Sequence, residues 1–110
     1  MKLGVLTVLF GNKPLNETCA YLKNLGVETV EIGCGGFPGK AHCDPEKLLA
    51  DEQALNQFLS DIRDNGLEIS ALSCHGNMVH PNRAVADAYI ADFKNAVLLA
   101  EKIGVDTLVT

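Results

Sequence analysis

Residues 66–82, GLEISALSCHGNMVHPN, decide the fold. The first part of this stretch is a run of apolar and β-branched residues with the length of a buried strand. Polar or reactive side chains then follow in close succession: Cys74, His75, Asn77, His80 and Asn82. In parallel α/β proteins the chemistry lies at the carboxyl ends of the strands. The stretch therefore predicts a buried parallel strand that ends in a functional loop.

The junction that opens this stretch occurs three times in the chain. Gly26, Gly66 and Gly104 each follow a helix-like segment and precede an apolar residue, an acidic residue and a strand-like run. Glycine suits such a junction because it takes the left-handed conformation that ends a helix without a Cβ clash. A helix–glycine–strand unit that recurs about every forty residues is typical of βα repeats around a parallel sheet.

The hydrophobic pattern predicts four strands and three main helices. The strands are expected over residues 2–10, 27–32, 67–73 and from 105 onward, and the outer helices over residues 15–25 and 83–103. A glycine-rich loop is expected over residues 33–42. Asp44 and Pro45 predict a short helical turn, and Asp51 is expected to cap the middle helix. The expected buried stripes of the three helices are Leu15, Cys19, Leu22 and Leu25, then Leu55, Phe58, Leu59 and Ile62, then Ala86, Ile90, Phe93, Val97 and Ala100.

These elements amount to nearly half of a (β/α)8 barrel. Such a barrel needs about 250 residues, whereas the chain has 110. We therefore expect an α/β fold of parallel βα repeats, in which residues 1–110 form a single domain, the amino-terminal half of a (β/α)8 TIM barrel. An assembly of half barrels and a small open sheet are the alternatives.

The composition narrows the classes of partner. The net charge of −5 argues against a groove for nucleic acid or an anionic membrane surface. No apolar run is long enough for a membrane span, and the short run near the amino terminus has no cleavage pattern after it. We therefore expect a cytoplasmic protein. The four cysteines have neither a C-x-x-C pair nor regular spacing, which predicts free thiols.

Glu31 is the first candidate for a catalytic residue. It alternates with Val30 and Ile32 in the second predicted strand. In a barrel the apolar face packs against the helices, so Glu31 is expected to point into the lumen near its mouth. Its carboxylate could act as a general base, a metal ligand or an acceptor for a hydroxyl. The alternative is a carboxylate that is solvated or satisfied by neighbouring donors.

His75 is the second candidate. It lies just past a buried strand, where a histidine can orient a sugar hydroxyl, ligate a metal or transfer a proton. The alternative is a histidine that is hydrogen-bonded into the loop. Asn77 and His80 follow in the same loop and are weaker candidates for binding substrate. His42 and Cys43 end the preceding loop, so a zinc site is conceivable, but the spacing matches no structural zinc pattern and we do not expect one.

The glycine-rich loop could bind a phosphate group. Its backbone N–H groups can cradle an anion, and Lys40 would assist. The loop matches neither the P-loop pattern nor the dinucleotide fingerprint, so an ordinary loop with positive φ angles is the favoured interpretation.

Two segments resemble a known family. VEIGCGGFPGKAHCDPEKLLAD, residues 30–51, and residues 66–82 resemble the sugar phosphate isomerase/epimerase family of xylose isomerase-like TIM barrels. The resemblance covers nearly the whole chain. It implies isomerisation or epimerisation of a sugar, sugar phosphate or polyol. It also implies a divalent metal (Mn, Mg, Zn or Co) in the complete barrel, which polarises the carbonyl oxygen while carboxylates move the proton.

The resemblance assigns two positions. It equates Glu31 with the strand-two carboxylate and His75 with the histidine at the end of strand three, which lines the pocket or binds metal. The main metal ligands are expected beyond residue 110. Related barrels include an endonuclease that cuts DNA at abasic sites, so a metal phosphodiesterase is one alternative, which the acidic charge disfavours. The other is a non-catalytic half barrel that associates with itself through its edge strands.

Overall fold

Four parallel strands form one sheet, in which neighbours in sequence are neighbours in space. The computed structural model describes all 110 residues. The sheet order is β1-β2-β3-β4, and every neighbouring pair is parallel. The strands are β1 (Gly4–Leu6), β2 (Thr29–Gly36), β3 (Glu68–His75) and β4 (Leu108–Val109).

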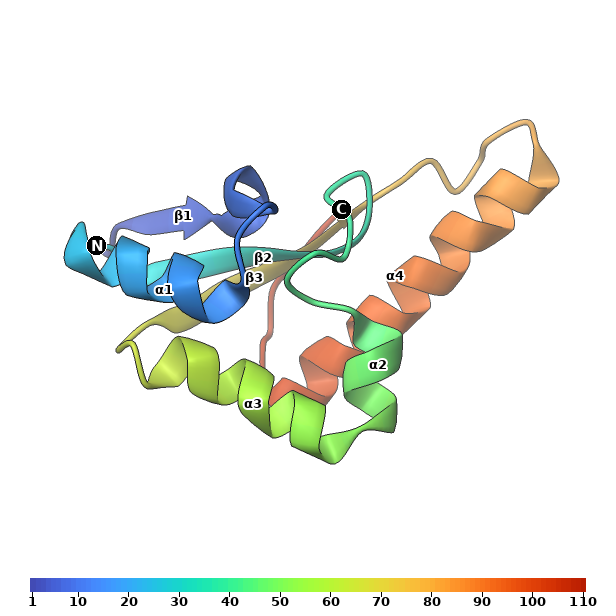
Figure 1. Ribbon diagram of the computed structural model, residues 1–110. Coiled ribbons are helices and arrows are strands. Elements are labelled where there is room, and N and C mark those ends of the chain that lie inside the picture. Colours follow the sequence, from blue (N-terminus) through green and yellow to red (C-terminus); the bar gives the residue numbers. More distant parts are fainter.

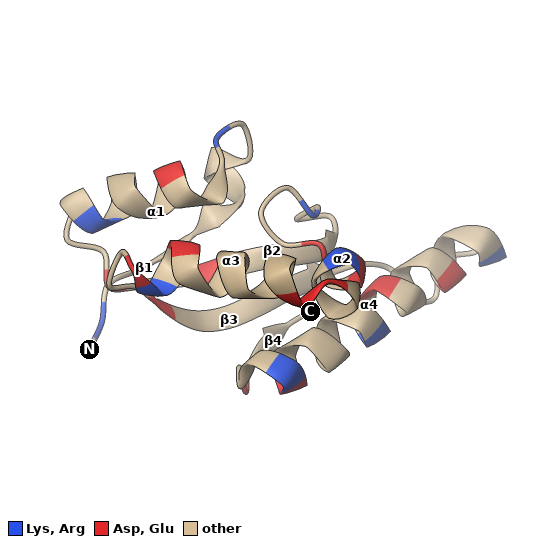
Figure 2. Ribbon diagram, turned by 60° about the horizontal axis from the view of Figure 1, so that its bottom comes forward, with Lys and Arg blue, Asp and Glu red and all other residues tan.

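The helices cover one face of this sheet (Figure 1). They are α1 (Leu15–Asn24), α2 (Pro45–Ala50), α3 (Glu52–Arg63) and α4 (Arg83–Ile103), and a 3-10 turn, η1 (Thr7–Phe10), follows β1. On the covered face Val30, Ile32 and Leu72 have no exposed surface and pack into one core with apolar residues of the helices. A parallel sheet with its helices on one side, seen from the side of α3 in Figure 2, confirms the predicted α/β class and is the arrangement of part of a (β/α)8 barrel.

The predicted junctions and caps are present. Gly26, Gly66 and Gly104 have φ angles of 82°, 70° and 73°, the left-handed conformation that only glycine adopts easily. The side chain of Asp51 accepts hydrogen bonds from two N–H groups in the first turn of α3. Asp44 and Asn82 cap α2 and α4 in the same way. The sequence therefore predicted where α2 and α3 begin from the chemistry of single residues, whereas α1 begins without a side-chain cap.

The predicted bounds of all four strands differ from the observed ones, and β4 begins at Leu108 rather than at residue 105. The first strand covers only Gly4–Leu6, because the chain turns into η1, which lays Val8 over Gly33. β2 runs through the glycines to Gly36, since Gly35 and Gly36 take φ angles of 152° and 64° and form a bulge against β3. β3 in turn continues to His75. The glycines that were predicted to open a loop instead prolong the strand.

Two helix faces also differ from the prediction. Val97 was expected in the core but is 43% exposed, because α4 turns Ala96 and Leu99 toward the sheet instead. Leu25 lies beyond the end of α1 and is exposed. The remaining predicted core positions are buried or half-buried. None of the helices combines the length and apolarity that crossing a membrane requires.

Candidate functional site

The face of the sheet opposite the helices carries polar side chains. Because strand residues alternate between faces, Glu31 and Ser73 point away from the core that contains Val30, Ile32 and Leu72. The register pairs Glu31 with Ala71 and Gly33 with Ser73, so the same face continues across both strands. His75 lies two residues beyond Ser73, at the carboxyl end of β3. We call this surface of β2 and β3 the open face, because no helix covers it; Val8 of η1 and Pro38 lie over it at Gly33.

Ser73 is the most informative residue of the open face. Its side chain is completely buried, yet its hydroxyl oxygen has no hydrogen-bond partner. Leaving a buried hydroxyl unpaired costs about 1–3 kcal/mol. Thr7, just past β1, has an unpaired buried hydroxyl too. Unpaired groups of this kind near strand ends favour a site that is completed by another molecule or segment.

His75 is half-buried, and its imidazole makes no hydrogen bond within the chain. Its backbone is fixed, because its carbonyl oxygen accepts the N–H of Phe37 at 2.8 Å. The prediction placed His75 in a loop, whereas it is the last residue of β3. A rigid backbone with a free imidazole at a strand end suits the handling of a hydroxyl or a proton.

Glu31 lies farther from His75 than the sequence suggested. Because β2 continues to Gly36, Glu31 is near the amino end of its strand and is half-buried. Its partner Ala71 precedes His75 by four residues, which separates the two levels by roughly 13 Å at the rise of a parallel strand. Both residues share the open face, but a small substrate cannot contact them at one point.

Asn77 and His80 hold their own loop in shape. The Asn77 side-chain oxygen accepts the N–H of Val79 at 3.1 Å. The Nδ1 atom of His80 accepts the N–H of Asn82 at 3.0 Å. These bonds fix the backbone of the segment that precedes α4, and the Asn82 side chain caps that helix. That Asn77 and His80 bind substrate stays a prediction.

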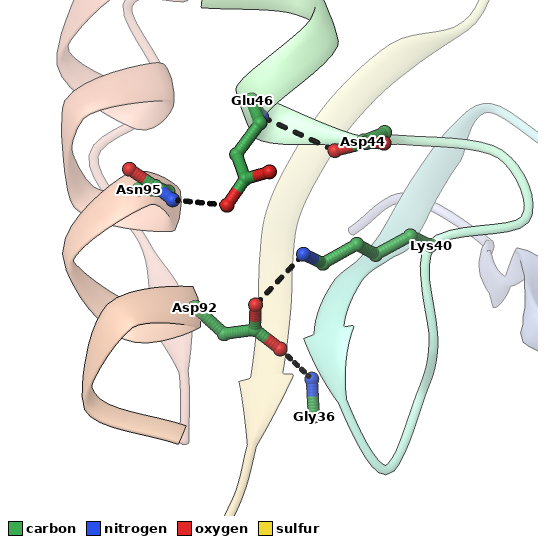
Figure 3. Close-up of polar contacts among 6 residues, drawn as sticks. All are labelled: Gly36, Lys40, Asp44, Glu46, Asp92 and Asn95. Carbon is green, nitrogen blue, oxygen red and sulfur yellow. Dashed lines mark hydrogen bonds and ion pairs between the residues drawn. The ribbon is translucent and has the colours of Figure 1, made fainter. Parts of the chain in front are cut away.

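Asp92, on α4, binds the glycine-rich segment at two points (Figure 3). One carboxylate oxygen accepts the Gly36 N–H at 3.0 Å, and the other lies 2.7 Å from the Lys40 Nζ. Burial opposes ionisation of Asp92, but the hydrogen bonds from Lys40 and Gly36 outweigh it and lower its pKa. The hydrogen bond to Asp92 raises the pKa of Lys40. The segment is therefore fastened to α4.

An aromatic pair lies beside His75. The Phe37 and Tyr89 rings are 5.5 Å apart between centroids and tilted by 51°. Gly76 is required here, because a Cβ at that position would collide with the Tyr89 ring. Phe37 remains 75% exposed. An apolar ring and an imidazole thus share the carboxyl-end edge of the sheet.

The cysteines and histidines do not converge. No three His, Cys, Asp or Glu side chains are grouped so that they could hold a metal ion. Cys74 points to the covered face and His75 to the open face, since they are neighbours in one strand. The His42 ring contacts the Lys13 carbonyl oxygen at 2.7 Å. All four cysteines are free and buried, which confirms the predicted free thiols, and burial raises the pKa of Cys34 to about 12.

Sequence reasoning missed Ser73 and Asp92. Ser73 carried a usable signal, because a serine between Leu72 and Cys74 in a buried strand is a polar residue at an interior position. Asp92 carried none, since its partner Gly36 is 56 residues away. Only the packing of α4 against β2 brings the two together.

Two comparisons place the chain among known proteins. A family model described as xylose isomerase-like TIM barrel matches residues 19–110. The chain is also similar to the uncharacterized protein YfiH of Bacillus subtilis (strain 168), with 27% identity over 81 residues. That match covers 74% of this chain and 26% of the relative, so it spans about a quarter of the relative's length.

Proposed function

The chain belongs to the xylose isomerase-like TIM barrel family, and on this premise we propose that it forms one wall of the pocket of a sugar or sugar-phosphate isomerase or epimerase. In barrels of this kind the pocket lies at the carboxyl ends of the strands. The open face of β2 and β3 presents its polar groups toward that end.

Ser73 is the observation that carries the proposal. Its hydroxyl is fully buried and unpaired, and it lies on the same face as His75, two residues earlier in β3. A polyhydroxylated substrate supplies groups that both donate and accept hydrogen bonds, so it can satisfy a serine hydroxyl and an imidazole together. A site built to hydrogen-bond hydroxyls also rejects ligands that lack them.

The proposed chemistry is the movement of a proton or hydride next to a carbonyl. In this scheme His75 binds and orients a substrate hydroxyl, and it can accept or return that hydroxyl's proton because its imidazole is unpaired. Ser73 fixes a second hydroxyl. Glu31 lies deeper on the same face, where a carboxylate can accept a hydrogen bond from the buried end of a linear sugar.

A divalent metal is common in this family, where it polarises the carbonyl oxygen of the substrate. The residues of this chain do not form a site for it. No group of three suitable ligands exists, and Glu31 and His75 are separated by roughly 13 Å along the strands. We therefore assign no metal ligand and derive no step through a metal from these residues. Metal dependence is proposed for the complete barrel.

Turnover of a panel of ketoses, aldoses and their phosphates by the full-length protein tests the proposal. The assay is run with added Mn, Mg, Zn or Co and again after chelation. We expect interconversion of at least one sugar pair, lost on chelation. The proposal would be overturned if the protein neither converted nor bound any of the sugars tested.

The matched variants are His75→Gln and His42→Gln. Glutamine at position 75 keeps hydrogen-bonding capacity but cannot carry the proton, so kcat should fall by about 100-fold or more. His42 contacts the Lys13 carbonyl on the helical side, so His42→Gln should leave kcat unchanged. Equal losses in both variants would show a structural effect only.

A further inference from the structure

The glycine-rich segment, residues 33–40, ends β2 at the carboxyl edge of the sheet, next to His75. It has the two features with which such a segment can bind a phosphate group. One is a backbone N–H group that a positive φ angle turns out of the strand ladder, at Gly36 (64°). The other is a cation, Lys40. Asp92 binds both of these features in the folded chain.

The charges around Lys40 are mostly negative. Besides Asp92, the carboxylates of Glu46 and Asp44 act on Lys40 and help to raise its pKa. Glu46 accepts a hydrogen bond from Asn95 of α4, and Asp44 from the Glu46 N–H (Figure 3). One cation therefore faces three carboxylates. An incoming phosphate dianion would meet net repulsion and would have to displace Asp92 from Lys40.

The same contacts present Phe37 to solvent. Its N–H bonds the His75 carbonyl oxygen, and its ring rests against Tyr89. The exposed ring belongs to the residue after Gly36, at the carboxyl edge of the sheet where His75 ends β3. Apolar rings with a few placed polar groups form the usual lining of sites for small ligands. A sugar can lay its C–H groups on such an exposed ring.

We propose that Asp92 is a specificity-determining positioning residue: by binding Lys40 and the Gly36 N–H, it makes this edge of the pocket select an uncharged sugar or polyol over the phosphate ester. The inference rests on the proposed function and names the substrate class of that site. It assigns Asp92 no contact with the substrate, because its role is to neutralise and fix the segment that lines the pocket.

Inorganic phosphate is the first probe, because its binding needs no turnover. Titration is followed by the NMR shifts of the Gly36 and Phe37 amides. The wild type should show no saturable shift, whereas Asp92→Asn removes one charge and frees Lys40, so phosphate affinity should rise about tenfold. Adding Lys40→Met to Asp92→Asn should abolish the gain. Saturable binding to the wild type at Gly36, or no gain in Asp92→Asn, would overturn the proposal.

Asp87→Asn is the matched control. Asp87 lies on the same helix and pairs with the exposed Arg83, away from the glycine-rich segment. This variant loses the same charge, so it should leave the Gly36 amide and phosphate binding unchanged. A similar gain in Asp87→Asn would assign the effect to net charge and overturn the role of Asp92.

The second probe is a ketohexose compared with its 6-phosphate in the turnover assay. The wild type should have a higher kcat/KM for the uncharged sugar than for its 6-phosphate. Asp92→Asn should reduce the ratio of these two kcat/KM values by lowering KM for the phosphate, with kcat unchanged. Preference for the phosphate ester by the wild type would overturn the substrate class. If no sugar is turned over, the proposed function fails, while the phosphate titration still decides what Asp92 does.

Discussion

The covered face and the open face of β2 and β3 belong to the same strands but have opposite chemistry. The covered face presents Val30, Ile32 and Leu72, which have no exposed surface and no polar atoms. The open face presents Ser73 and His75, which have hydrogen-bonding groups that the chain does not use. Alternation along a strand is enough to separate them. One face therefore determines stability, and the other is the face that we propose for binding.

Removing a large side chain from the covered face should have the largest effect on folding. Leu72→Ala leaves a cavity between the sheet and the helices, which should reduce the free energy of unfolding by about 2–5 kcal/mol. Urea unfolding followed by circular dichroism measures it. The conservative Leu72→Met should cost less than about 1.5 kcal/mol. A loss below 1 kcal/mol for Leu72→Ala would show that the two faces are not as different as the structure indicates.

Gly36 is the residue at which the pairing of β2 with the end of β3 can be disrupted. A Cβ at this position would collide with the His75 carbonyl oxygen, and its φ of 64° already disfavours other residues. Gly36→Ala should therefore cost about 2–4 kcal/mol and speed hydrogen exchange at the Phe37 amide. Gly39→Ala is the control, because its φ is 73° but a Cβ there meets nothing. It should cost about 1–2 kcal/mol. Equal costs would mean that the collision is relieved without effect.

The parts of the fold that depend on single residues or on period were predictable. Gly26 predicted a junction because φ is a property of that residue, and Asp51 predicted a helix start because its side chain reaches only the next turn. The end of β2 was not predictable, since Gly35 and Gly36 continue the strand only because β3 lies beside them with a shifted register. A local sequence pattern predicts local backbone geometry. A bulge depends on how two strands pair, so the pattern of one strand does not predict it.

The candidate site likewise has features that the local sequence predicts and features that depend on packing. His75 was proposed as a candidate because it follows a buried strand in sequence, which is local information. The distance between His75 and Glu31 could not be predicted from the sequence, because it depends on where both strands end. Asp92 was missed for a similar reason, as its contact with Gly36 exists only after α4 packs against the sheet. The residues of a site can be proposed from sequence, but the distances between them follow from the packing.

The pair of Asp92 and Lys40 fastens the edge of the site to the covered side, and pH tests its contribution. Since the pKa of Asp92 is lowered, its stabilisation is full above the ordinary aspartate pKa of about 3.9 and is lost as pH falls through the lowered pKa. Since the pKa of Lys40 is raised, its contribution is full below about 10.4 and is lost as pH rises through the raised pKa.

The expected effect is modest because both side chains are partly exposed, at 23% and 32%. At pH 7 Asp92→Asn should be less stable than the wild type by about 1 kcal/mol. The difference should shrink when unfolding is measured well below the ordinary aspartate pKa of about 3.9 and well above the ordinary lysine pKa of about 10.4. A difference that stays constant with pH would show that the ion pair is not what fastens the segment.

The smallest effect on stability should come from the open face itself. Ser73→Ala removes a buried hydroxyl that has no partner, so the free energy of unfolding should stay the same or rise by up to about 1 kcal/mol. Sugar binding should nevertheless weaken, because the proposed site uses this hydroxyl to bond the ligand. A variant that is more stable but binds more weakly would separate the roles of the two faces within one strand. If Ser73→Ala lost as much stability as Leu72→Ala, Ser73 would be part of the core, and the open face could not be assigned to binding.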